Sequence, residues 1–273
     1  MKTILITGTS SGIGKATALL FSEKGWNVAA AMRNSENFAE LNKVKNINTY
    51  IIDVTEIKSI EKCIGQILQE YGKIDVVVNN AGVYTTNPLE STSLEVIDSI
   101  IKTNINGVLY MTKAILPHFR ENKGGIIVNI SSIAGQATFP FQSVYHVSKW
   151  AIEGLSEGLM YELNPLNIKM KIVEPGMVKT NLYRSVIENS FVQYPIEYAN
   201  NFRNWHTYLM GNYEKGYNPN LDAKTIYKAV TDGTSRLRYK SDFNTKLVLF
   251  LRSIFSLSIF QNIITNQSKL KQK

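Results

Sequence analysis

Cysteine and histidine are scarce in this sequence of 273 residues, which contains one cysteine and three histidines. The single cysteine, Cys63, excludes an internal disulfide framework and is compatible with a reducing compartment, so we expect a cytoplasmic protein. His118 and His206 have no metal-ligand spacing with cysteine or carboxylates. We therefore predict no metal site.

Long apolar runs without a charge are also missing. The apolar N-terminus passes into a glycine turn at Gly8, which is too soon for a secretory signal, so we expect a first strand there. Residues 244–273 are rich in apolar side chains, but Arg252 interrupts them and argues against a transmembrane helix. Two interpretations of this basic amphipathic segment stay open: contact with an anionic membrane surface, or a terminal helix that covers the pocket or a subunit interface. The second is favoured.

Acidic residues are fewer than basic ones, 22 against 30. The basic excess lies mainly in residues 236–273, which carry eight Lys or Arg and one acidic residue, Asp242. The rest of the chain is close to neutral, which does not support a nucleic-acid-binding surface. The composition is that of an ordinary soluble globule, and the sequence shows no repeat or linker. We expect one domain over residues 1–273.

The pattern that is present is an alternation of short apolar strands and amphipathic helices. After an opening strand that ends at Thr7, strands are expected at residues 27–32, 49–52, 74–78, 126–130 and 168–173. Helices are expected between Gly14 and Gly25, at 56–71 and 93–102, from Gly107 to Asn122, and at 143–163. This alternation predicts an α/β fold with a doubly wound parallel sheet, whose ligands bind at the carboxyl ends of the strands.

The first of these strand ends carries a glycine-rich turn. Gly8, Gly12 and Gly14 are spaced as Gly-x-x-x-Gly-x-Gly between the opening strand and the first helix. Backbone N–H groups at a helix N-terminus attract anions, and glycines let a pyrophosphate approach the backbone. The turn therefore predicts a dinucleotide-phosphate site, and a plain strand-to-helix turn is the alternative.

The second and third strand ends bear on which nucleotide would bind. In dinucleotide sites, a carboxylate after the second strand binds the ribose 2′-hydroxyl, whereas an arginine suits a 2′-phosphate. Here Arg33 occupies that place and no carboxylate comes before Glu36, so NADP(H) is favoured over NAD(H); a solvated loop cation is the other interpretation of Arg33. After the third strand, Asp53 either binds the adenine amino group or caps the helix that begins near Glu56.

The remaining strand ends carry small and polar residues. Residues 79–82 read Asn-Asn-Ala-Gly, where the asparagines can bond neighbouring backbone and the small pair leaves room for a cofactor. Amides after the turn at Pro175 and Gly176 can meet a cofactor carboxamide. The predicted cofactor-binding residues all lie at a strand end or on the helix that follows one: Gly8, Ser10, Ser11, Gly12, Ile13, Gly14, Arg33, Asp53, Val54, Asn80, Ala81, Gly82, Tyr145, Lys149, Pro175, Gly176, Val178 and Thr180.

Tyr145 and Lys149 lie at positions i and i+4 of an expected helix, with Ser132 thirteen residues before the tyrosine. Residues four apart share a helix face. An ammonium beside a phenol favours the phenolate, so we expect Lys149 to lower the pKa of Tyr145 and to make it a usable acid or base.

Together these motifs resemble the short-chain dehydrogenase/reductase family over about residues 1–182. The resemblance implies a Rossmann-type sheet of seven strands, the seventh near residues 237–240, and a dimer or tetramer. It also implies hydride transfer between a nicotinamide and a carbonyl or alcohol, with Tyr145 as the general acid/base. Lys149 would assist it and hold the nicotinamide ribose, Ser132 would orient the substrate oxygen, and Asn104 would hold a water that links Lys149 to solvent. His146, inside the motif, is expected at a variable position.

The resemblance makes residues 183–220 a variable lid over the substrate. Nine aromatic residues between Tyr183 and Tyr217 favour a hydrophobic ketone, aldehyde or alcohol, although they could equally pack the lid or a subunit contact. Two other functions stay open. A non-catalytic dinucleotide-binding regulator is disfavoured by the intact Ser132, Tyr145 and Lys149, and an epimerase or dehydratase of the related extended group is disfavoured by the glycine spacing and by residues 79–82.

Overall fold

The computed structural model describes residues 1–35, 38–183 and 193–271. Seven parallel strands form one sheet in the order β3-β2-β1-β4-β5-β6-β7. The strands are β1 (Thr3–Thr7), β2 (Asn27–Met32), β3 (Ile47–Ile51), β4 (Val76–Asn79), β5 (Gly125–Ile130), β6 (Ile168–Glu174) and β7 (Arg238–Lys240). The expected doubly wound parallel sheet is confirmed, and each predicted strand is present with ends shifted by at most two residues.

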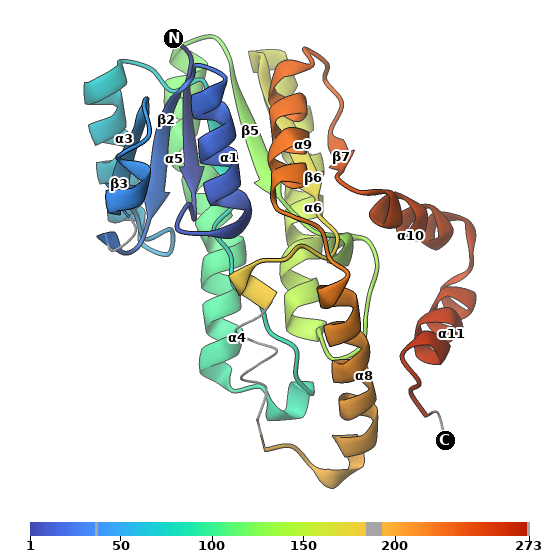
Figure 1. The fold of residues 1–273 in the computed structure, drawn as a ribbon. Coiled ribbons are helices and arrows are strands. Elements are labelled where there is room, and N and C mark those ends of the chain that lie inside the picture. Colours follow the sequence, from blue (N-terminus) through green and yellow to red (C-terminus); the bar gives the residue numbers. More distant parts are fainter. Residues whose placement is uncertain (36–37, 184–192, 272–273) are drawn as a thin grey trace.

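Helices cover both faces of this sheet (Figure 1). On one face lie α1 (Gly12–Glu23) and α9 (Asn220–Thr231), and on the other lie α3 (Ile57–Tyr71), α5 (Gly107–Glu121) and α6 (Ser143–Leu163). The sequence of β1 shows why: Ile4 and Ile6 pack with the first pair of helices, whereas Leu5 packs with the other three. Apolar residues on both sides of a strand require cover on both sides, which parallel crossovers provide.

The remaining helices lie at the edges of this core. They are α2 (Phe38–Leu41), α4 (Leu94–Ile100), α8 (Ile196–Glu214), α10 (Phe243–Ile254) and α11 (Leu257–Gln267). A π-helical segment, Ile101–Asn106, joins α4 directly to α5, where the sequence predicted a break between two helices. Within the described ranges, no helix is long and apolar enough to cross a membrane.

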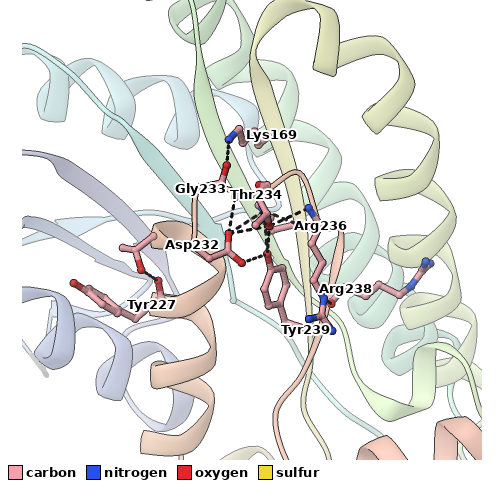
Figure 2. A network of polar contacts seen from close by, with 10 residues as sticks. Lys169, Tyr227, Asp232, Gly233, Thr234, Arg236, Arg238 and Tyr239 are labelled. Carbon is pink, nitrogen blue, oxygen red and sulfur yellow. Dashed lines mark hydrogen bonds and ion pairs between the residues drawn. The ribbon is translucent and has the colours of Figure 1, made fainter.

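The short edge strand β7 is held by a polar network, which Figure 2 shows. The Tyr239 hydroxyl donates to Asp232 Oδ2 over 2.6 Å, and the Asp232 Oδ1 atom accepts from the backbone N–H of Thr234 over 3.0 Å. From β6, the buried Lys171 ammonium donates to the Thr234 carbonyl over 2.6 Å. These bonds connect the end of α9 to both β6 and β7, so β7 stays in register although it has only three residues.

Candidate active site

Helix α6 places Tyr145 and Lys149 on one buried face beside the end of β5. The Lys149 ammonium donates to the carbonyl of Ile130, the last residue of β5, over 2.8 Å. The same nitrogen lies 5.7 Å from the centroid of the Tyr145 ring. Ser132 follows two residues after that strand, and its hydroxyl accepts from the N–H of Ala134 over 3.1 Å. The three side chains predicted from sequence spacing therefore meet at one strand end.

The electrostatics of this group differ from the expectation. Burial, followed by the nearby Tyr183, raises the pKa of Tyr145 well above its usual value, while a hydrogen bond with Ser132 acts in the opposite direction. The sequence predicted a lowered pKa for this phenol, whereas burial raises it in the described structure. Burial also lowers the pKa of Lys149 to about 8, and the neighbouring Glu153 only partly offsets it. Desolvation disfavours the charged form of both groups, which explains both directions.

The glycine turn has the backbone geometry of an anion site. Gly8 and Gly12 have positive φ angles of 71° and 57°, which L side chains rarely adopt. In the described chain, α1 has no acidic residue in its first turn, and the extended Ser11 makes no side-chain capping bond. The free N–H groups of a helix N-terminus and the positive end of its dipole then face the cleft. These residues fit the pyrophosphate of a dinucleotide.

Asn80 connects this turn to the end of β4. Its amide nitrogen donates to the carbonyls of Thr7 over 2.9 Å and of Gly8 over 3.1 Å. A Cβ on Gly14 would overlap both the Gly8 carbonyl oxygen and this amide nitrogen. Gly14 therefore packs behind the turn, and the expectation that it contacts a cofactor directly is not supported.

One cleft runs along the carboxyl ends of the strands, and its lining matches the prediction closely. The predicted residues that line it are Gly8, Ser10, Ser11, Gly12, Ile13, Arg33, Asp53, Val54, Asn80, Ala81, Gly82, Ser132, Tyr145, Lys149, Pro175, Gly176, Val178 and Thr180. Of the predicted set, Gly14 and Asn104 lie outside the lining formed by the described residues. The lining residues that the prediction omitted are Met32, Asn34, Ile52, Val83, Thr103, Ile130, Ser131, Leu182 and Tyr183. Ile130 and Ser131 could have been found, because they end the same strand that leads to Ser132.

Asn104 lies in the π-helical segment and makes three hydrogen bonds to protein groups. Its oxygen accepts from the N–H of Val83 over 2.8 Å, and its nitrogen donates to the Val83 carbonyl over 2.9 Å and to Ser148 Oγ over 3.0 Å. Ser148 precedes Lys149 on α6. Asn104 thus holds the loop after β4 against the helix that carries the tyrosine and the lysine.

The two residues expected to recognise the adenosine end lie where the prediction put them. Arg33 is exposed at the rim of the cleft, and Glu36 lies outside the described residues. The Asp53 carboxylate accepts from the N–H of Thr55 over 2.9 Å and from its hydroxyl over 2.7 Å. Asp53 forms a turn ahead of α3, whose N-cap is Glu56, so the alternative role of helix cap is wrong.

Aromatic side chains enclose the cleft beside Tyr145. The Tyr84 ring meets the Tyr145 ring edge to face at 4.8 Å and the Tyr183 ring at 4.7 Å. From α8, Trp205 joins the same cluster, and its indole N–H donates to the Thr86 hydroxyl over 3.0 Å. Residues 184–192 of the predicted lid, including Phe191, lie outside the described residues.

His146 fixes the loop that follows Ser132. The N–H of Phe139 donates to His146 Nε2 over 2.8 Å, so Nδ1 carries the proton and donates to the Ala134 carbonyl over 2.9 Å. Burial lowers the pKa of this imidazole, which favours the same neutral form. The sequence assigned His146 no role, because its partners are backbone groups that a motif does not reveal.

Comparison with known proteins agrees with this geometry. The sequence matches the family model of short chain dehydrogenases over residues 2–190. A 3-ketodihydrosphingosine reductase from Bacteroides thetaiotaomicron is 35% identical over 256 residues, which cover 93% of this chain and 91% of the relative.

Two solved structures extend the likeness to the fold. A short-chain dehydrogenase from Streptomyces avermitilis has a TM-score of 0.81 and 30% identity, covering 98% of this chain and 97% of its own. A structure of ElxO with NADP bound has a TM-score of 0.74 and 29% identity, covering 89% of this chain and 99% of its own. The chain therefore belongs to the short-chain dehydrogenase/reductase family and is an NAD(P)-dependent oxidoreductase.

Proposed function

We propose that this enzyme uses NADP(H) to reduce a ketone or aldehyde carried on a hydrophobic molecule, or to oxidise the corresponding alcohol. The observation that carries this proposal is the convergence of Ser132, Tyr145 and Lys149 on a cleft that begins at the glycine turn. A nicotinamide cofactor bound there would supply the hydride to the carbonyl carbon.

The protein's own part in the reaction is to position the substrate and to supply the proton. Ser132 orients the carbonyl oxygen, and the Tyr145 hydroxyl gives that oxygen its proton. The raised pKa of Tyr145 keeps the phenol protonated near neutrality, which suits the direction of reduction. Lys149 holds the ribose of the cofactor and favours the phenolate left after transfer. Asn104 supports the relay that returns a proton to Lys149.

The preference for NADP(H) is supported by Arg33 at the rim of the cleft. An arginine at the end of the second strand suits a 2′-phosphate, because its guanidinium can donate two parallel hydrogen bonds to phosphate oxygens. NADP is bound in the ElxO structure, so a related fold accommodates this cofactor. On the opposite side of the cleft, the residues from Pro175 to Thr180 would meet the nicotinamide carboxamide.

The hydrophobic substrate is supported by the aromatic side chains around Tyr145. Tyr84, Tyr183 and Trp205 are buried in one cluster beside the phenol, and residues 183–220 would form the lid over it. The relative of similar length from Bacteroides thetaiotaomicron is named for a ketone on a long alkyl chain. A ketone of this class, with an apolar tail, fits the chemistry of the cluster.

The proposed setting is the cytoplasm, and the proposed assembly is a homo-oligomer built from one domain per chain. A single buried cysteine supports a reducing compartment. The assembly rests on the family, whose members are commonly oligomeric.

To test this proposal, purified enzyme is incubated with ketones of increasing alkyl length and either NADPH or NADH. The rate of cofactor consumption is measured, and the products are identified by mass spectrometry. We expect NADPH to be consumed faster than NADH, a product heavier by two hydrogens, and a kcat/KM that rises with chain length. A product isomerised without net redox change, or equal rates along the series, would contradict the proposal.

A further inference from the structure

We propose that the C-terminal arm, defined as α10 and α11 (residues 243–267), docks this enzyme on an anionic lipid bilayer. The arm follows the last strand and extends away from the sheet, beside α8 (Figure 1). Sequence alone favoured a role in covering the pocket or a subunit interface. The structure shows that the arm has two apolar faces and that the body of the protein covers only one of them. The inference does not depend on the proposed reaction.

The inward face of the arm is firmly attached to the protein. Leu249 of α10 packs with Phe260 and Ile264 of α11 against Ala137, in the loop that follows Ser132. Beyond α11, the carbonyl of Lys269 accepts from the Asn204 amide of α8 over 2.7 Å. The arm is therefore a fixed platform, and its outward side chains have defined positions.

The outward face of α10 is a continuous apolar stripe. Phe243, Leu247, Phe250 and Ile254 are 73%, 42%, 57% and 54% exposed. Their spacing of four, three and four residues places them on one side of the helix, opposite the buried Thr245 and Leu249. The exposed Phe255, Leu257 and Ile259 continue this surface into α11. Single exposed apolar residues are ordinary, but a contiguous row of this kind marks an interaction site.

Charge identifies the partner. Residues 243–273, the arm and the segment after it, carry five Lys or Arg and no acidic residue. Just before the arm, the Asp242 carboxylate is occupied in capping α10, where it accepts from the N–H and the hydroxyl of Thr245. Arg238 on β7 does not add to this charge, because it pairs with Glu153 and Glu157. The exposed Lys246 lies beside the apolar stripe on α10. Lys269 and Lys271 are exposed after α11. A basic surface with a row of phenylalanines and aliphatic residues is complementary to anionic headgroups above an apolar interior.

A second copy of the chain fits this surface less well. A twofold interface brings the same patch of both subunits together, so it would set two basic segments against each other without a carboxylate between them. A helix of twelve residues is about 18 Å long, well short of the ~30 Å hydrocarbon core, so the arm would lie on the bilayer rather than cross it. Such docking would hold the loop after Ser132 and helix α8 close to the membrane surface, because Ala137 of the loop and Tyr208 of α8 both contact the arm.

The test is vesicle flotation of the full chain with phosphatidylcholine vesicles and with vesicles that also contain phosphatidylglycerol. We expect the protein to float with the anionic vesicles at low ionic strength and to be released as salt is raised. The double variant Phe243→Ser/Phe250→Ser should lose roughly a hundredfold in binding, since burial of each ring contributes about tenfold or more. It should keep its solution activity, which shows that it is folded.

The matched control is Leu94→Ser/Tyr161→Ser, which removes two large side chains, 76% and 77% exposed, from α4 and α6. This control should bind vesicles as the unmodified protein does. Analytical ultracentrifugation of the same proteins tests the competing partner. Absence of flotation at low ionic strength, or equal binding by the stripe variant, would overturn the proposal. So would dissociation of an oligomer in the stripe variant, because the stripe would then join two copies of the chain.

Discussion

At the scale of the residue, burial decides the chemistry of Tyr145 and Lys149 more than their spacing does. Both side chains are almost completely buried, and desolvation raises the pKa of the phenol and lowers that of the amine. The i and i+4 positions predicted that the two groups share a helix face, which is correct. The sequence could not reveal that Tyr84 and Tyr183 enclose the phenol, because one follows β4 and the other follows β6, far apart in the chain.

Arg33 provides the residue-level test of cofactor choice. Arg33→Ser should weaken NADPH binding by about tenfold or more while leaving NADH binding nearly unchanged, because only NADPH carries the 2′-phosphate that this guanidinium would hold. Fluorescence titration with each cofactor measures the two dissociation constants. Lys43→Ser, which removes another exposed cation ten residues away, should change neither. Equal weakening of both cofactors by Arg33→Ser would refute the assignment.

At the scale of the element, helix α9 is tied to the cofactor cleft through one buried carboxyl group. Asp222, in the first turn of α9, accepts from the Tyr217 hydroxyl over 3.0 Å. That hydroxyl accepts in turn from the N–H of Gly176 over 3.0 Å. Burial raises the pKa of Asp222 from 3.8 to about 7, although the hydroxyls of Ser241 and Tyr217 act to lower it. The turn after β6 is therefore held, through Tyr217, by a carboxyl group that ionises near neutral pH.

This raised pKa predicts how stability depends on pH. Because folded Asp222 holds its proton more tightly than the unfolded chain does, its contribution is fully present below pH 3.8 and is lost as the pH rises to about 7. Asp222→Asn removes the titration and keeps an oxygen for Tyr217. Relative to this variant, the unmodified protein should lose roughly 3 kcal/mol of unfolding free energy between about pH 5 and pH 8. Urea denaturation of both proteins at these pH values measures it, and a constant difference would contradict the buried-carboxyl account.

Element boundaries show where sequence reasoning succeeded and where it stopped. Helix α6 was predicted at its observed ends, Ser143 and Leu163, because its apolar periodicity is long and uninterrupted. The π-helical segment from Ile101 to Asn106 was predicted as a break, since Thr, Asn and Gly at residues 103–107 are common in loops. In the structure, bonds from Asn104 to Val83 and Ser148 stabilise the unusual turn. Contacts between distant segments override local propensity here.

At the scale of the whole molecule, the cleft exists because the sheet brings separate strand ends to one edge. Residues from Gly8 to Tyr183 line it. Asn80 connects the ends of β4 and β1, and Lys149 connects α6 to the end of β5. The rule that ligands bind at the carboxyl ends of parallel strands predicted most of this lining. It could not predict where α8 and the C-terminal arm lie, because α8 packs into the aromatic cluster and the arm packs on the loop that follows Ser132.

The central claim is that this assembled cleft delivers a proton from Tyr145 during hydride transfer. The most direct measurement compares kcat and the NADPH dissociation constant of Tyr145→Phe with those of Tyr161→Phe, which alters an exposed tyrosine on the same helix. Tyr145→Phe should lower kcat roughly a hundredfold or more and leave NADPH binding nearly unchanged, because the substitution keeps the ring in the cleft lining and removes only the hydroxyl that transfers the proton. Tyr161→Phe should change neither. Turnover by Tyr145→Phe at the rate of the unmodified enzyme would contradict the account.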